Sequence, residues 1–371
     1  MTLLPVAAKI YRGIVGTWLG FWGLVLVGAV VGQVLPLAPD NLVSALAFVP
    51  IFWVAVLLVP GLLLALPLAR KRYCLGGLML LAASYLAFGD VYPLRFVSHS
   101  VPTISNGTIK VVAANLQFYL HGIENVADHL RRLDGDVYLL SENELTPEKE
   151  ARLRLALPDY HLYLGRYQSC ALITKEPFVW YQEVELPSHQ ASLGGYDNTP
   201  ERIVNKPKRA FMHGILERAG QRIHFLSIRF IAGRSGKPGP FHQLRWGRYL
   251  LRTQVAEARF FADYVRKLDG PVIFGGDLNA PPRSKTIAIV NELGTDAAAA
   301  VNGLPFNTFR TQNTVPLIRL DYLFGSQGAV PMTLERSAQI FSDHYALVGQ
   351  FAITPAELTP ERIRQARGPK D

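Results

Sequence analysis

Residues 272–280 read VIFGGDLNA, and the rest of the chain can be understood by working outward from this stretch. The apolar run Val272–Phe274 predicts a buried strand that two glycines end. Asp277 and Asn279 come next, and a Pro-Pro pair then prevents a regular continuation. Residues two apart on an extended backbone point to the same side, so we expect both side chains to face one cleft. Alternatively, both are turn residues that satisfy local backbone donors.

Charge is distributed unevenly along the 371 residues, of which 49% are hydrophobic. The first hundred positions hold six basic and two acidic residues, a net charge of +4 that leaves +5 for the remainder. This mild surplus permits a phosphate-bearing substrate but does not indicate the clustered basic face of a nucleic-acid-binding protein. The two cysteines, Cys74 and Cys170, lie far apart and indicate neither a disulfide framework nor a zinc site.

Three apolar segments open the chain, at residues 13–35, 42–69 and 74–91. Each is near the ~20 residues that a helix needs to cross a bilayer, so residues 1–95 are expected to form a membrane anchor with three transmembrane helices. Lys9 and Arg12 precede the first segment, and the basic triplet 70–72 separates the second from the third. The positive-inside rule therefore places the N-terminus and the triplet in the cytoplasm, and the chain after residue 95 on the periplasmic side of the inner membrane. If the third segment is instead a re-entrant or core helix, the large C-terminal domain is cytoplasmic.

A polar linker is expected at residues 96–107, then a domain at 108–353 and a charged tail at 354–371. The order strand, helix, strand at its start indicates a layered α/β unit. Strands are expected at 109–115, 137–142, 160–164, 171–174, 179–184, 211–217, 223–230, 320–324 and 345–353. Helices are expected at 125–133, 147–157, 243–268 and 284–293.

Polar residues recur where these strands begin or end, which is the position of most sites in layered α/β proteins. Beside Asp277 and Asn279 they are Asn115, Glu142, Asp321, Asp343 and His344. Each one alone is more typical of a turn or a surface pair. Their recurrence in several strands instead indicates a single site.

This set of residues resembles the endonuclease/exonuclease/phosphatase (DNase I-like) superfamily, over residues 108–353. The superfamily includes DNase I-like nucleases, abasic-site endonucleases, sphingomyelinases and inositol-polyphosphate 5-phosphatases. Five motifs in family order carry the resemblance: the strand to Asn115, residues 136–142 ending in Ser-Glu, GDLN at 276–279, RLDY at 319–322 and SDH at 342–344. The resemblance implies a four-layer α/β-sandwich, with two packed mixed β-sheets flanked by helices, and a divalent-metal phosphoesterase.

The resemblance also implies the metal site. Glu142 would be the main ligand of Mg²⁺ (or Mn²⁺), with Asn115 close by and Asp343 as a further candidate ligand. Mg²⁺ takes few protein oxygens and keeps waters and a substrate phosphate oxygen.

The other family residues would act on the substrate. Asp277 would orient the attacking water and Asn279 would hold the phosphoryl group. His344 would be a general base or a phosphate contact, and Asp321 would fix its tautomer. The reaction implied is in-line attack of water on a phosphate ester.

One position departs from the family pattern. Many members carry a histidine near the end of the strand that here reads FLSIRF at 225–230, and Arg229 takes its place. Because arginine binds phosphate oxygens bidentately, we expect Arg229 to contact the substrate phosphate. Alternatively, Arg229 is a solvated strand residue. The next loop, 233–239, is basic and glycine-rich and is expected to contact an anionic substrate.

Two classes of function are compatible with these residues. The first is a membrane-tethered, metal-dependent phosphoesterase acting on nucleic acid, a phospholipid headgroup or a small phosphate ester. Tethering modestly favours lipid or envelope substrates. The second is a catalytically weak or inactive family member that serves as a membrane-anchored binding module, for which Arg229 is the support. No obligate protein partner is indicated.

Overall fold

The computed structural model describes residues 3–34, 60–61, 63–64, 108–167, 169–187, 209–218, 220–232, 240–282, 284–301, 307–310, 318–337 and 341–354. Most of the second apolar segment lies outside these residues. So do the third segment, the linker, the loop 233–239 and nearly all of the tail.

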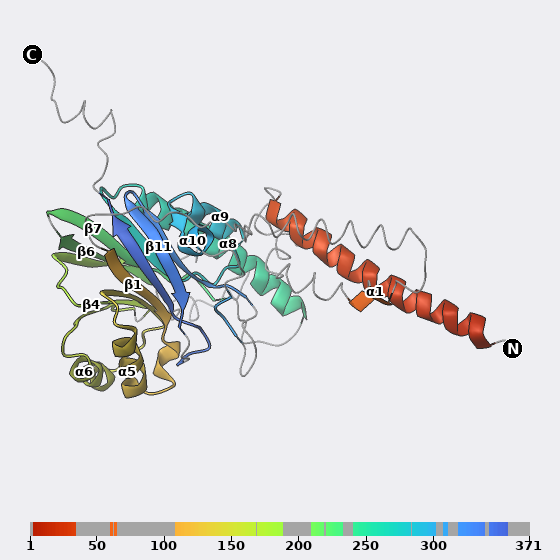
Figure 1. The fold of residues 1–371 in the computed structure, drawn as a ribbon, viewed down its shortest axis with the longest axis horizontal. Helices are drawn as coiled ribbons and strands as arrows, with labels where there is room; N and C mark the ends of the chain where they lie inside the picture. Colours follow the sequence, from red (N-terminus) through yellow and green to blue (C-terminus); the bar gives the residue numbers. More distant parts are fainter. Residues whose placement is uncertain are drawn as a thin grey trace, which may run out of the picture.

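An apolar helix, α1 (Leu3–Val34), begins about ten residues earlier than the sequence predicted, so that Lys9 and Arg12 lie inside it. Its stretch Val6–Gly28 is long and apolar enough to cross a membrane, and it is the one such helix among the described residues. A signal sequence near an N-terminus would have the same length and composition. Figure 1 shows α1 extending away from the α/β unit.

Two six-stranded sheets form the α/β unit. The first has the strand order β11-β12-β1-β2-β4-β3, and the second has the order β5-β6-β7-β8-β10-β9. The strands of the first sheet are β11 (Ala329–Arg336), β12 (Leu347–Ile353), β1 (Thr108–Asn115), β2 (Val137–Ser141), β4 (Cys170–Thr174) and β3 (His161–Leu164). In the second they are β5 (Trp180–Glu185), β6 (Ala210–Arg218), β7 (Gln221–Ser227), β8 (Val272–Asp277), β10 (Asp321–Ser326) and β9 (Thr295–Asp296). The pairs β1–β2 and β7–β8 are parallel and the other described pairs are antiparallel, so both sheets are mixed.

Helices cover the outer face of each sheet (Figure 1). Helices α5 (Ile123–Leu133) and α6 (Pro147–Ala156) pack on the first sheet. Helices α8 (Pro240–Val265) and α9 (Lys285–Asn291) pack on the second. The short η3 (Gln117–Tyr119) and α10 (Ala297–Val301) complete the described helices of the unit. The predicted four-layer α/β-sandwich is confirmed.

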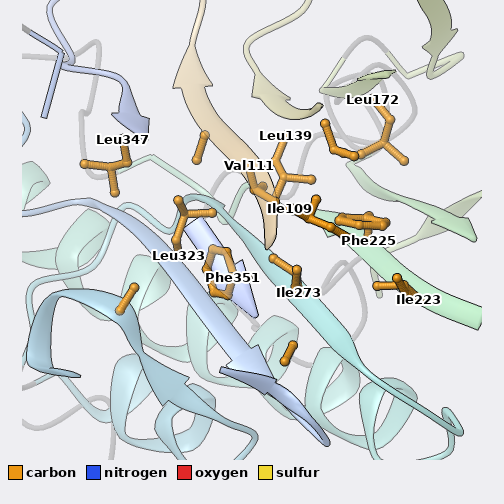
Figure 2. Packing of buried hydrophobic residues seen from close by; sticks show 14 of the residues in the cluster. Ile109, Val111, Leu139, Leu172, Ile223, Phe225, Ile273, Leu323, Leu347 and Phe351 are labelled. Carbon is orange, nitrogen blue, oxygen red and sulfur yellow. The ribbon is translucent and has the colours of Figure 1, made fainter. Parts of the chain in front are cut away.

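The two sheets meet in a shared apolar core (Figure 2). Val111 and Leu139 come from the first sheet, and Phe225, Ile273 and Leu323 from the second. Strand β8 is buried at all six positions, because the core covers one of its faces and α8 and α9 cover the other. This double burial explains its nearly continuous apolar sequence.

Two predicted strand ends were wrong. The glycines at 275 and 276 do not end β8, which continues to Asp277. A Cβ on Gly275 would lie 2.1 Å from the carbonyl oxygen of Tyr322, so the close approach of β10 requires glycine inside the strand. Strand β7 ends at Ser227, so Arg229 lies in the loop after it.

Strand β11 was not predicted at all. Its sequence AVPMTLER contains Pro331, and the pairing with β12 shifts register between Pro331 and Thr333. A proline and a bulge interrupt the alternation by which an edge strand is recognised.

Candidate active site

The sheet registers bring the predicted site residues to one edge of the sandwich. Asn115 is level with Ser141 at the ends of the parallel strands β1 and β2. In the second sheet, Asp277 is directly opposite Asp321 across β8 and β10. Ser141 Oγ accepts a hydrogen bond from the backbone nitrogen of Asp277 (3.3 Å), which joins the two sheets at this edge.

Asp277 is at the centre of the site and is buried (1% exposed). Its Oδ2 accepts hydrogen bonds from Asn115 Nδ2 (2.9 Å) and Asn279 Nδ2 (3.0 Å), and its Oδ1 accepts from the backbone nitrogen of Asn279 (3.0 Å). Asp277 and Asn279 therefore contact each other, and the bond from the backbone nitrogen of Asn279 is the local turn bond of the alternative interpretation. Asn279 has a left-handed backbone (φ 49°), so the chain turns back at this residue instead of continuing in an extended conformation.

Glu142 and Arg229 form an ion pair on one side of Asp277. Arg229 Nη2 lies 2.5 Å from Glu142 Oε1, and Arg229 Nε lies 3.9 Å from Asp277 Oδ2. The side chains of Arg229 and Glu142 are only 15% and 13% exposed. The interpretation of Arg229 as a solvated strand residue is therefore wrong. Its Nε is buried and has no hydrogen-bond partner among the described residues.

Asp321 and His344 form the second pair. His344 Nδ1 lies 2.7 Å from Asp321 Oδ2. Because a carboxylate only accepts, this contact places a hydrogen on Nδ1. Thr308 Oγ1 accepts from the backbone nitrogen of Asp321 (3.0 Å) and holds the start of β10.

The carboxylates of the site and the imidazole of His344 shift one another's pKa values. Burial raises the pKa of Asp277 to about 6, and Asp321 and Glu142 add to this, while His344 and Arg229 oppose it. Burial opposes a charge on His344, but Asp321 and Asp277 outweigh it and raise its pKa to about 10. Protonated His344 and Arg229 thus place positive charge on either side of Asp277.

The donors at this edge fit a hard divalent cation. Ligand atoms of Asp277, Asp321 and His344 all lie within 4.8 Å of one another. Glu142 uses Oε1 in the pair with Arg229, which leaves Oε2 for a ligand. Carboxylate oxygens suit Mg²⁺ or Mn²⁺.

Two residues of the implied metal site have other contacts. Asn115 has both ends of its amide engaged, because Nδ2 donates to Asp277 and Oδ1 accepts from the backbone nitrogen of Gln117 (2.8 Å). Asp343 Oδ1 lies 4.0 Å from His344 Nε2, and its side chain is 34% exposed. It lies at the rim, outside the buried group of three.

Sequence reasoning missed two residues of α8, Gln254 and Glu257, whose side chains hold the loops of the site in place. Gln254 Nε2 donates to the carbonyl oxygens of Ile231 and Asn279, both at 2.8 Å. Glu257 is fully buried and accepts from the backbone nitrogen of Ile231 (3.1 Å) and from Arg209. The available signal was their spacing, which places both polar residues on the apolar stripe of α8 between Leu250 and Phe261.

The family model "Endonuclease/Exonuclease/phosphatase family" matches residues 112–344. The chain therefore belongs to this family. No curated protein matches it.

Solved structures show the same fold. An endonuclease/exonuclease/phosphatase from Bacteroides vulgatus has a TM-score of 0.52 at 14% identity, over 67% of this chain and 100% of that chain. A functionally unknown conserved protein from Enterococcus faecalis has a TM-score of 0.50 at 14% identity, over 66% and 100%. A mannosyl-6-phosphatase from Bacteroides thetaiotaomicron has a TM-score of 0.48 at 15% identity, over 66% and 100%. At these identities the likeness concerns the fold alone.

Proposed function

We propose that this protein is a membrane-tethered, divalent-metal-dependent phosphoesterase that hydrolyses its substrate by in-line attack of water. The observation that carries the proposal is the position of Asp277, which lies between the Glu142–Arg229 and Asp321–His344 pairs at one sheet edge. Carboxylates that can hold a cation and direct a water, beside cationic donors for phosphoryl oxygens, are what this reaction requires.

Glu142 would hold Mg²⁺ or Mn²⁺ through Oε2, with the carboxylates of Asp277 and Asp321 as further candidate ligands. The bound cation supplies neutralisation of negative charge on the phosphate. Asn115 keeps the Asp277 carboxylate in place through its 2.9 Å hydrogen bond.

The remaining residues act on water and phosphate. Asp277 orients the attacking water, which needs an acceptor, and its raised pKa suits it to take up a proton near neutral pH. Arg229 donates to the phosphoryl oxygens. Asn279 Nδ2 donates to Asp277 Oδ2 and to the carbonyl oxygen of Phe230, so Asn279 joins Arg229 only by exchanging one of these bonds for the phosphate. His344, held by Asp321, adds a further donor through Nε2. Because water is the nucleophile, no covalent enzyme intermediate forms.

Membrane attachment is supported by α1 and its neighbour. The Tyr11 hydroxyl donates to the carbonyl oxygen of Leu64 (2.6 Å), and the side chains of Trp18 and Leu19 crowd Gly61. The described residues 60–61 and 63–64 of the second apolar segment thus lie against α1. We propose a multi-pass anchor in the inner membrane, with the catalytic domain placed on the periplasmic side by the basic triplet 70–72.

A second candidate is a binding module with little or no activity. The observation that favours it is the Arg229–Glu142 ion pair, since a guanidinium bound to the main metal ligand competes with a cation. Metal-dependent turnover separates the two candidates.

The test uses the full chain in a mild detergent with Mg²⁺, Mn²⁺ or EDTA. The panel is bis-p-nitrophenyl phosphate, p-nitrophenyl phosphate, plasmid DNA and mixed phospholipids. We expect metal-dependent hydrolysis of one class, and about a 10²-fold or larger loss in Glu142→Gln. The exposed neighbour Glu144 gives the matched control, because Glu144→Gln should retain full activity. If the folded protein hydrolyses none of the panel compounds, the binding module is favoured.

A further inference from the structure

A left-handed turn comes directly after β1. Gln117, Phe118 and Tyr119 have φ values of 45°, 54° and 60°, a run that L-residues avoid because the Cβ crowds the next carbonyl oxygen. The turn is fastened to site residues: the backbone nitrogen of Gln117 donates to Asn115 Oδ1 (2.8 Å), and that of Phe118 donates to the carbonyl oxygen of Glu142 (3.1 Å). Strained backbone of this kind clusters at ligand sites.

The turn presents one aromatic ring and buries the other. Tyr119 is 4% exposed and its hydroxyl donates to Asn143 Oδ1 (2.5 Å), whereas Phe118 is 39% exposed. The guanidinium carbon of Arg229 lies 6.0 Å from the centre of the Phe118 ring. Phe118 is thus an apolar surface, held in a fixed position beside the cationic group that we assign to the substrate phosphate.

We propose that Phe118 is a specificity residue, which packs against an apolar group esterified to the substrate phosphate. The proposal rests on the proposed function, in which Arg229 binds that phosphate. With the phosphate on Arg229, the group on its ester oxygen lies beside the ring. A planar ring would stack there and an alkyl chain would cover it, whereas a polyol would gain no apolar contact. Aryl esters and alkyl esters of phosphate are the two kinds of substrate that carry such a group.

Phosphonates test this contact, because their carbon–phosphorus bond is not hydrolysed. Methyl-, butyl- and phenylphosphonate would be titrated into the full chain, in detergent with Mg²⁺, by calorimetry. We expect phenyl- or butylphosphonate to bind about fivefold more tightly than methylphosphonate, the scale of one buried apolar contact. Tighter binding of phenyl- than of butylphosphonate indicates a planar group, and the reverse order indicates an alkyl chain.

Variants of the turn show whether Phe118 causes this preference. Phe118→Ala should abolish it, so that the three phosphonates bind alike, and Phe118→Tyr should restore it. Leu120→Ala is the matched control: Leu120 is 72% exposed beside the same turn, and its loss should leave the preference intact.

Equal affinity for the three compounds, or a preference that survives Phe118→Ala, would overturn the proposal. The hydrolysis assay on the same preparations keeps it distinct from the proposed function. Metal-dependent hydrolysis without the preference removes only the role of Phe118. A preference that depends on Phe118, without hydrolysis, keeps the contact and removes the phosphoesterase.

Discussion

Arg229 is the residue at which the resemblance led us to expect a histidine. Its guanidinium contacts Glu142 and lies near Asp277, so it neutralises part of a cluster of carboxylates that would otherwise repel one another. The Arg229 side chain is still 15% exposed, and through this exposed part it would donate to a phosphoryl oxygen in the proposed function. A histidine in this place would also donate a hydrogen bond, but it would carry a positive charge only when protonated, whereas arginine is always charged.

Substitution of Arg229 tests which of these effects dominates. We expect Arg229→Ala to lower kcat/KM by about 10²-fold, because one phosphate donor is lost and Glu142 loses its countercharge. Arg229→His should retain more activity than Arg229→Ala. Steady-state kcat and KM on the ester hydrolysed best are the measurement.

Arg218→Ala is the control for the loss of an ion pair, because Arg218 pairs with Glu176 at the surface, in a contact that is not part of the site. It should change kcat/KM by less than about twofold, as surface pairs contribute little. A gain of activity in Arg229→Ala would contradict the phosphate role and show that the guanidinium blocks the metal ligand.

Among the strands and helices, those with a strong local pattern were predictable. β1, β2 and β8 are short apolar runs that end in polar residues, and those polar residues do meet at one edge. α6 begins as expected at Pro147, directly after Thr146, whose Oγ1 accepts from the backbone nitrogen of Lys149. The resemblance placed these elements in the correct fold.

The features that the sequence did not predict depend on contacts between distant residues. The glycine pair in β8 looks like a strand end until β10 lies against it. The left-handed turn at 117–119 has no glycine or asparagine to mark it, because bonds to Asn115 and Glu142 impose it. Gln254 fits the helical pattern of α8, and only the tertiary structure shows that it holds two site loops.

Strands β6 and β7 carry a chain of hydrogen bonds away from the site. His224 Nε2 lies 3.0 Å from the carbonyl oxygen of Asp269, His224 Nδ1 lies 2.9 Å from His213 Nε2, and His213 Nδ1 lies 2.8 Å from the Tyr264 hydroxyl. Since a carbonyl only accepts, His224 donates through Nε2, His213 donates through Nε2, and Tyr264 donates to His213. Both imidazoles are then neutral and fully hydrogen-bonded.

Acid should therefore destabilise the domain. Burial lowers the pKa of His213 to about 3, with His224 adding to the effect, and burial also lowers the pKa of His224. In the unfolded chain a histidine titrates near 6.5, so below that pH the unfolded state binds more protons than the folded state. The resulting stability is present above about pH 6.5 and is lost as the pH falls toward 3. At pH 4.5 we expect a loss on the order of 2 kcal/mol from His213.

Denaturant unfolding between pH 8 and pH 4.5 measures this loss. His213→Gln cannot titrate, so its unfolding free energy should fall less between the two pH values than that of the wild type. The difference in unfolding free energy between the two proteins at pH 8 gives the effect of the substitution that does not depend on pH. Equal pH dependence in the two proteins would show that the histidine pair takes up protons without unfolding.

The whole molecule joins an apolar helix to an endonuclease/exonuclease/phosphatase domain. If the helix is the membrane anchor that we propose, the side of the membrane on which the domain lies decides which substrates the domain meets. The described residues establish one helix long enough to cross. The basic triplet 70–72 is the feature on which the proposed orientation depends, since basic loops stay in the cytoplasm.

Protease access measures the orientation. In cells with a permeabilised outer layer, proteinase K should cleave after residue 96 and release the domain, while a cytoplasmic marker protein stays intact. Neutralising the triplet, as Arg70→Gln, Lys71→Gln and Arg72→Gln together, should protect a fraction of the molecules, because the charge difference that orients the anchor is weakened. A domain that is protected in the wild type until the inner membrane is broken would be cytoplasmic. With the N-terminus in the cytoplasm, that result would mean that the chain crosses the membrane an even number of times before the domain. The substrates would then be restricted to cytoplasmic phosphate esters.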